Sequence, residues 1–128
     1  MIIDTTFLID LEREISRKKP GSAMEFLARN HAQTMRISVV TFGELAEGYE
    51  DPAAPELEEL IAPYEIVEIT RSIGRRYAAI SRVLRSSGSR LGDNDLWIGA
   101  TAIEVGEPLV TRDHDHFRRI TGLTAMGY

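Results

Sequence analysis

Short apolar runs alternate along this chain with longer stretches in which apolar residues recur at helical spacing. The short runs predict strands at residues 1–3, 35–38, 65–69 and 108–111, and a last edge strand at 123–126. The helical spacing predicts helices over residues 7–15, 22–28, 41–49, 56–61, 71–85 and 96–105, and a short helix at 117–120. Because strands alternate with helices, we predict an α/β fold. Its mostly parallel sheet of four or five strands would be covered by helices on both faces, giving three layers.

The helix that starts near Leu96 is apolar nearly all the way round, a pattern typical of a helix buried in a core. Two carboxylates, Asp93 and Asp95, stand directly before this apolar run. Free backbone N–H groups and the helix dipole favour a carboxylate in the cap or first turn, so either residue taken alone is expected to be a cap. Acids at three other element ends suggest a second interpretation, in which these residues belong to a site.

The other acids are Asp4, Glu44 and Asp113. Asp4 and Asp113 directly follow predicted strands, and Glu44 lies about one turn into a predicted helix. In open parallel sheets, sites form beyond the carboxyl ends of the strands, so we expect these acids to meet there if their helices begin at that edge. Two plainer interpretations stay open. Asp4 alone could be a turn residue, and Glu44 the back-bonding half of a capping box that starts at Thr41.

The composition fits a single domain over residues 1–128, because a chain of this length with 43% hydrophobic residues can bury one sizeable core. The sequence has neither a run of about 18 apolar residues nor a signal-peptide pattern, so we expect a cytoplasmic protein without a membrane segment. The chain contains no cysteine, which leaves oxygen and imidazole as its metal ligands. Oxygen ligands favour hard cations.

The net charge of −5 argues against a protein that binds nucleic acid by neutralising many phosphates. It is compatible with a nuclease, because metal ions supply positive charge at the reaction centre. The basic residues are also unevenly placed, since one third of the chain holds Arg71, Arg75, Arg76, Arg82, Arg85 and Arg90. These arginines either guide RNA, face solvent or bind an acidic partner.

Several carboxylates in one cleft repel one another unless cations neutralise them, so convergence of the four acids would predict a bound metal. Mg²⁺ and Mn²⁺ accept carboxylate and water ligands, and Mg²⁺ takes substrate phosphate as a further ligand. Such a site suits phosphodiester cleavage, because the metal makes hydroxide from bound water and stabilises charge on the reacting oxygens.

Four motifs, taken together, resemble the PIN-domain family, specifically the VapC-type toxins of toxin–antitoxin pairs. They are Asp4-Thr5, residues 41–48 (Thr-Phe-Gly-Glu-Leu-Ala-Glu-Gly), residues 93–102 (Asp-Asn-Asp-Leu-Trp-Ile-Gly-Ala-Thr-Ala) and residues 110–117 (Val-Thr-Arg-Asp-His-Asp-His-Phe). The resemblance spans the whole chain, in order and at the usual length. It implies a PIN-like α/β/α sandwich that acts as a Mg²⁺- or Mn²⁺-dependent endoribonuclease.

The resemblance also implies site residues and partners. The metal-binding and catalytic acids would be Asp4, Glu44, Asp95 and Asp113, supported by the polar side chain of Thr111. Asp93 and Asp115 either bind a second metal or cap a helix. The partners would be RNA, a second copy in a homodimer, and a cognate VapB-type antitoxin that often places an arginine in the acidic cleft.

Other functions are compatible with parts of this pattern. A different metal-dependent phosphohydrolase would use the same carboxylates on other phosphoesters, and a non-catalytic PIN-like binding module would keep the core and lose the acids. A receiver-type signalling domain is disfavoured, because its chemistry needs a lysine after a late strand and the last lysine here is Lys19.

Side chains near the acids receive plainer interpretations. His114 and His116 are expected to be solvated, Trp97 to lie in the core or a dimer contact, and Tyr77 to take part in packing.

Overall fold

A computed structural model describes all residues of the chain, 1–128. Its elements, in order, are β1 (Ile2–Ile3), α1 (Thr5–Ser16), α2 (Ser22–Arg29), β2 (Arg36–Ser38), α3 (Val39–Glu47), α4 (Pro55–Ile61), β3 (Glu65–Val67), α5 (Arg71–Ser87), α6 (Asp93–Val105), β4 (Leu109–Val110), α7 (His114–Phe117) and β5 (Ala125–Met126). Every strand and helix predicted from the sequence has a counterpart, but α7 spans His114–Phe117 and so begins three residues before the helix predicted at 117–120.

The five strands form one sheet in the order β3-β2-β1-β4-β5, and every neighbouring pair is parallel. In the centre, Ile3 of β1 is in register with Val110 of β4. The prediction of a mostly parallel sheet is therefore confirmed. Because all strands point the same way, the residues that follow them lie along one edge, which is where sites form in such sheets.

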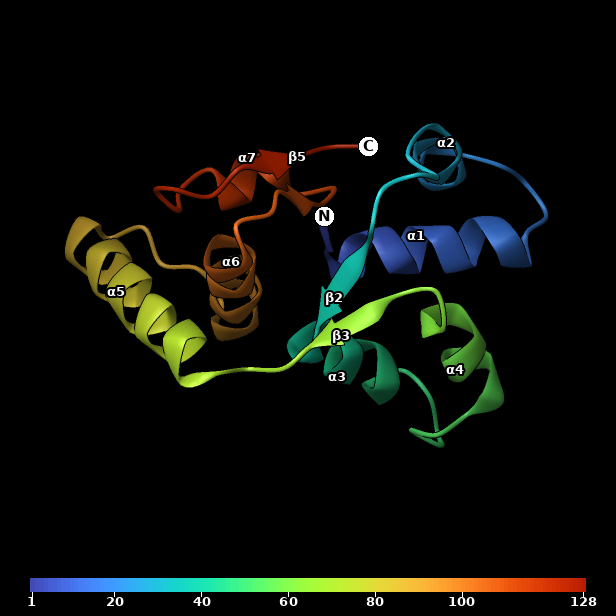
Figure 1. Cartoon of the computed structure of the whole chain (residues 1–128), viewed down its shortest axis with the longest axis horizontal. Coiled ribbons are helices and arrows are strands. Elements are labelled where there is room, and N and C mark those ends of the chain that lie inside the picture. Colours follow the sequence, from blue (N-terminus) through green and yellow to red (C-terminus); the bar gives the residue numbers. More distant parts are fainter.

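Helices cover both faces of the sheet, as Figure 1 shows with α1 to α4 on one side of the strands and α5 and α6 on the other. Successive strand residues point to opposite faces. Accordingly, Ile3 and Val110 pack into a core with side chains of α1 to α4, whereas Ile2 and Leu109 pack into a second core with α5, α6 and α7. The predicted α/β/α sandwich is confirmed.

Helix α6 is the most deeply buried helix, as its sequence predicts. Ile98, Ala100 and Ala102 have no exposed surface, and α6 packs along α5. Gly106 ends the helix in a left-handed conformation with φ of 70°, which glycine adopts without steric cost. None of the helices is both long and apolar enough to span a membrane.

The start of α3 also differs from the predicted element. Ser38 is the N-cap, and its side chain accepts a hydrogen bond from the Thr41 backbone N–H at 3.0 Å. The helix therefore begins at Val39, directly after β2, and the predicted capping box from Thr41 to Glu44 is wrong. The apolar run Val39-Val40 hides this boundary, because such residues favour a strand when judged by propensity alone.

Candidate active site

The site begins at the ends of β1 and β4, the two strands at the centre of the sheet. Asp4 follows β1 and is only 3% exposed. Thr111 follows β4, is fully buried, and donates a hydrogen bond from its hydroxyl to Asp4 Oδ2 at 2.7 Å. The Thr6 hydroxyl donates to the same oxygen at 2.9 Å. Two hydroxyl groups from opposite ends of the chain thus fix one buried carboxylate.

The carboxyl group of Asp4 is buried, where its ionised form is unfavourable. Burial raises the pKa of its carboxyl group, hydrogen bonds from Thr111, Thr6 and the Thr5 backbone lower the pKa, and the negative charge of Asp95 raises it again. The net direction is upward, because burial is the largest effect. Because the charge of Asp95 acts on Asp4, two of the predicted acids lie near each other at this edge. No lysine or arginine forms an ion pair with either carboxylate.

Glu44 joins the site through the residue after Asp4. Its side chain accepts a hydrogen bond from the Thr5 hydroxyl at 2.7 Å, and it is half-buried. It does not bond back to its own helix end, because Ser38 already caps α3. The plainer interpretation of Glu44 as a capping residue is therefore ruled out, and its carboxylate faces the turn between β1 and α1.

Asp93 and Asp95 lie in the first turn of α6, as predicted, but their side chains turn to different neighbours. The N-cap is Gly92, which has no side chain to accept a capping hydrogen bond. Asp95 Oδ2 lies 3.2 Å from His116 Nε2, and Asp93 accepts a hydrogen bond from the Tyr77 hydroxyl at 3.0 Å. Asp95 thus belongs to the group around Asp4, while Asp93 is held against α5.

Asp113 and Asp115 lie at the start of α7. Asp113 is the N-cap residue of α7, is exposed, and donates its backbone N–H to Thr111 Oγ1 at 3.1 Å. Thr111 therefore links Asp113 to Asp4. Asp115 instead pairs with Arg118 at 2.8 Å and is largely exposed, which places its carboxylate on the surface of its own short helix.

The structure thus brings the four predicted acids to one edge of the sheet without grouping them into a single coordination shell. Asp4 binds two hydroxyl groups, Glu44 binds Thr5, and Asp95 binds His116. No group of three or more His, Asp or Glu side chains in the chain is close enough to hold a metal ion. The edge is an acidic site whose oxygens are individually held by hydrogen bonds.

Sequence reasoning missed two contacts here. His116, expected to be solvated, contacts Asp95, and Tyr77, assigned to packing, also binds Asp93. The packing part of that interpretation is confirmed, because the Tyr77 ring stacks on Trp97 with centroids 4.0 Å apart. Spacing alone gives no signal for either contact, since both join different elements.

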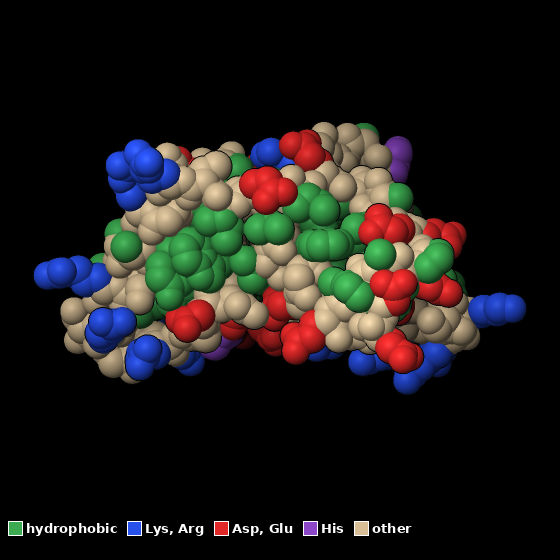
Figure 2. Space-filling model, turned by 90° about the horizontal axis from the view of Figure 1, so that it is seen from below, with side chains coloured by type: hydrophobic (Ala, Val, Ile, Leu, Met, Phe, Trp, Pro, Cys, Tyr) green, Lys and Arg blue, Asp and Glu red, His purple; other side chains and the backbone are tan.

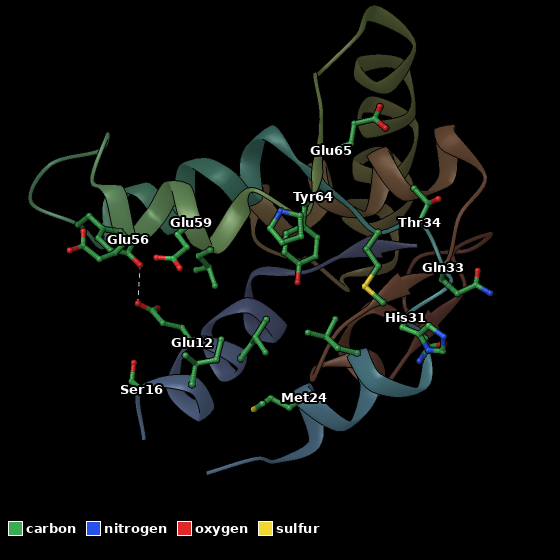
Figure 3. A pocket seen from close by; sticks show the side chains of 18 residues that line it. Glu12, Ser16, Met24, His31, Gln33, Thr34, Glu56, Glu59, Tyr64 and Glu65 are labelled. Atoms are coloured by element: carbon green, nitrogen blue, oxygen red, sulfur yellow. Dashed lines mark hydrogen bonds between the residues drawn. The ribbon is translucent and has the colours of Figure 1, made fainter. Parts of the chain in front are cut away.

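A separate groove of about 970 Å³ lies between α1, α2 and α4, as Figure 3 shows. Its wall includes the apolar side chains of Leu11, Met24, Leu27 and Leu60. Its rim is acidic, with Glu12 on α1 opposite Glu56 and Glu59 on α4 (Figure 3). Glu56 and Glu59 are exposed and have no ion-pair partner, whereas Glu12 accepts a hydrogen bond from Tyr49 at 2.8 Å.

Known proteins resemble this chain over 62% to 98% of its length. The PIN domain family model matches residues 1–123. Ribonuclease VapC4 of Mycobacterium tuberculosis is 32% identical over 87 residues, which are 62% of this chain and 67% of that protein. Ribonuclease VapC1 of Methanocaldococcus jannaschii is 27% identical over 121 residues, 94% of this chain and 80% of that one. The crystal structure of DNA-bound VapBC from Salmonella typhimurium matches with a TM-score of 0.82 at 27% identity, covering 98% of this chain and 96% of the other.

Proposed function

The chain belongs to the PIN-domain family, and from that premise we propose that it is a VapC-type toxin, an endoribonuclease that cleaves RNA phosphodiester bonds with the help of a divalent metal ion. The domain that carries this activity spans residues 1–128, and it acts in the cytoplasm. The observation that carries the proposal is Asp4. It is a buried carboxylate at the functional edge of the sheet, beside Asp95 and without a basic partner.

We assign the metal to Asp4, Glu44, Asp95 and Asp113. The donors fit Mg²⁺ or Mn²⁺, because all four offer carboxylate oxygen. The charge also fits, because a buried carboxylate next to a second one lacks a neutralising cation. Asp93 and Asp115 are less suited as metal ligands, because the Tyr77 hydroxyl binds Asp93 and Arg118 binds Asp115. An ion held by these residues would supply positive charge that lowers the pKa of water and stabilises charge on the phosphate.

The chain's own residues prepare the site for this chemistry. Thr6 and Thr111 orient Asp4 by binding one of its oxygens, and Thr5 orients Glu44. His116 holds Asp95 at the start of α6. Removing a residue that orients a metal-binding carboxylate commonly lowers metal affinity or activity by about 10- to 100-fold.

The test is cleavage by the purified protein of RNA, single-stranded DNA and a phosphomonoester, each with and without Mn²⁺. We expect cleavage of RNA only, and only with the metal. Asp4→Asn and Asp95→Asn should each abolish it while circular dichroism stays unchanged, and Asp51→Asn, in an exposed loop, should not. Cleavage of the monoester would indicate another phosphohydrolase, and cleavage of none a non-catalytic module. Undiminished RNA cleavage by both site variants would contradict the assigned residues.

We further propose that a VapB-type antitoxin inhibits this toxin and that part of it occupies the groove between α1, α2 and α4. An apolar wall with an unpaired acidic rim suits a segment with apolar residues on one side and basic residues on the other. The toxin itself forms a homodimer, which sedimentation of the purified protein would test.

A further inference from the structure

Helix α5 carries a row of arginines along one side. At about 100° per residue, Arg71, Arg75, Arg82 and Arg85 fall within an arc of about 80°. The four side chains are exposed, and none takes part in an ion pair or a side-chain hydrogen bond. Arg76, on another side of the helix, differs because it binds Glu104 at 2.7 Å. We call the four residues together with Arg90 the arginine strip.

The arginine strip ends at the acidic site. Tyr77 joins α5 to the first turn of α6 by donating to Asp93 and by stacking on Trp97. Arg85 lies about two turns after Tyr77 on α5, and Arg90 lies two residues before Gly92, the N-cap of α6. Arg85, in the last turn of α5, and Arg90, in the loop before α6, therefore lie where the chain passes from α5 to the acidic first turn of α6.

The surface of the strip suits a polyanion better than the interior of a protein interface. Between the arginines, this side of α5 carries small residues such as Gly74, Ala78 and Ser81, so the guanidinium groups are accessible. The apolar edge of the helix is elsewhere, where Val83 is 60% exposed beside Ile80. In Figure 2, Lys and Arg side chains project at both ends of the molecule, including the end that holds α5, and acidic side chains gather over α4.

We infer that the arginine strip binds phosphates of a single-stranded RNA next to the bond that is cleaved. This inference rests on the proposed function and adds how the substrate is held. Guanidinium groups bind phosphate oxygens in a bidentate manner, and from Arg71 to Arg85 the helix is about 21 Å long. A narrow row matches one strand, and it gives a chain with a net charge of −5 a local surface for RNA.

The test measures binding apart from cleavage. A fluorescein-labelled single-stranded RNA of about 12 nucleotides is titrated in EDTA at several salt concentrations with wild type, Arg85→Gln/Arg90→Gln, and the control Arg17→Gln/Arg29→Gln. The control changes the net charge equally at exposed arginines at the C-terminal ends of α1 and α2. We expect the slope of log K against log salt to become shallower by about 1.4 in the strip variant, which is about 0.7 for each lost phosphate contact. The control should keep the wild-type slope.

Equal slopes for wild type and strip variant, or an equal change in the control, would overturn the inference. If the strip variant instead lost binding of the antitoxin or of a second copy, the strip would belong to a protein partner. Cleavage in Mn²⁺ separates this outcome from the proposed function. RNA binding through the strip without any cleavage would contradict the ribonuclease, whereas cleavage with an unchanged slope would contradict only the strip.

Discussion

Thr111 and Asp4 are 107 positions apart in the chain, yet the Thr111 hydroxyl lies 2.7 Å from Asp4 Oδ2. The parallel pairing of β1 with β4 creates this contact. Because Ile3 and Val110 are in register, the residues that follow them, Asp4 and Thr111, lie side by side at the same edge of the sheet. The hydrogen bond favours the ionised form of Asp4, whereas burial favours the neutral form. The two threonine hydroxyls therefore keep a buried carboxylate usable as a ligand.

The first prediction concerns this support. Thr111→Val should weaken Mn²⁺ binding and lower kcat/KM for RNA by about 10- to 100-fold, because it removes a hydrogen bond that orients a ligand and stabilises its charge. Isothermal titration with Mn²⁺ and cleavage kinetics measure the two effects. Thr121→Val, at an exposed position, serves as the matched control. Unchanged Mn²⁺ affinity in Thr111→Val would show that the contact has no part in the site.

The second prediction is that Asp4→Asn stabilises the metal-free protein. Since the folded state raises the pKa of Asp4, folding is favoured when the carboxyl is protonated, and this stability is lost as the pH rises and the group ionises. At pH 7 in EDTA, the variant should gain on the order of 1 kcal/mol in free energy of unfolding. In urea denaturation it should also lack the loss of stability that the wild type shows as the pH rises above 3.8, the ordinary pKa of this carboxyl group. A variant less stable than wild type at pH 7 would refute this.

Bound metal should make the wild type more stable than Asp4→Asn. At 100 times its dissociation constant, a bound ion stabilises the wild type by about 2.7 kcal/mol, while Asp4→Asn should gain much less. The same denaturation series repeated in Mn²⁺ supplies this measurement.

The third prediction concerns the groove. Glu56→Lys/Glu59→Lys should weaken antitoxin binding about tenfold or more, because the acidic rim would then repel basic residues of the partner. Surface plasmon resonance with immobilised antitoxin measures the affinity. Glu25→Lys/Glu68→Lys makes the same change of charge at exposed residues outside the groove lining and should bind normally. Equal weakening by both pairs would indicate a general charge effect.

The fourth prediction concerns an ion pair at the other edge of the sheet. Burial works to raise the pKa of Glu107, but hydrogen bonds from Arg36 and the Met1 amino group outweigh it, so the pKa is lowered in the folded protein. The pair contributes stability above the unfolded pKa and loses it as the pH falls through the folded pKa. Glu107→Gln should cost about 1–3 kcal/mol at pH 7 and less at pH 3. An equal cost at both pH values would contradict the ionic contribution.

Much of the fold can be predicted from the sequence, because the relevant signals are local. The alternation of apolar runs and amphipathic stretches predicts the parallel sheet, and the apolar pattern around Ile98 predicts a buried helix. The start of α3 could not be predicted as well. Ser38 and Thr41 can both serve as an N-cap. Which of them caps the helix depends on where β2 stops pairing with β3.

The candidate site shows the same limit. The positions of Asp4, Asp95 and Asp113 at element ends follow from periodicity and the rule for parallel sheets. Which neighbour each carboxylate contacts depends on packing between distant segments, so the roles of Thr6 and His116 had no local signal. The groove could not be predicted from the sequence either, because three separate helices form it.

The pairing of β1 with β4 has a consequence for the toxin during its own synthesis. A nascent chain that has left the ribosome only as far as α6 already carries Asp4, Glu44 and Asp95, but its central strand lacks a neighbour on one side and Asp4 lacks the hydroxyl of Thr111. The acidic site therefore stays incomplete until Thr111 has left the ribosome, close to the end of translation.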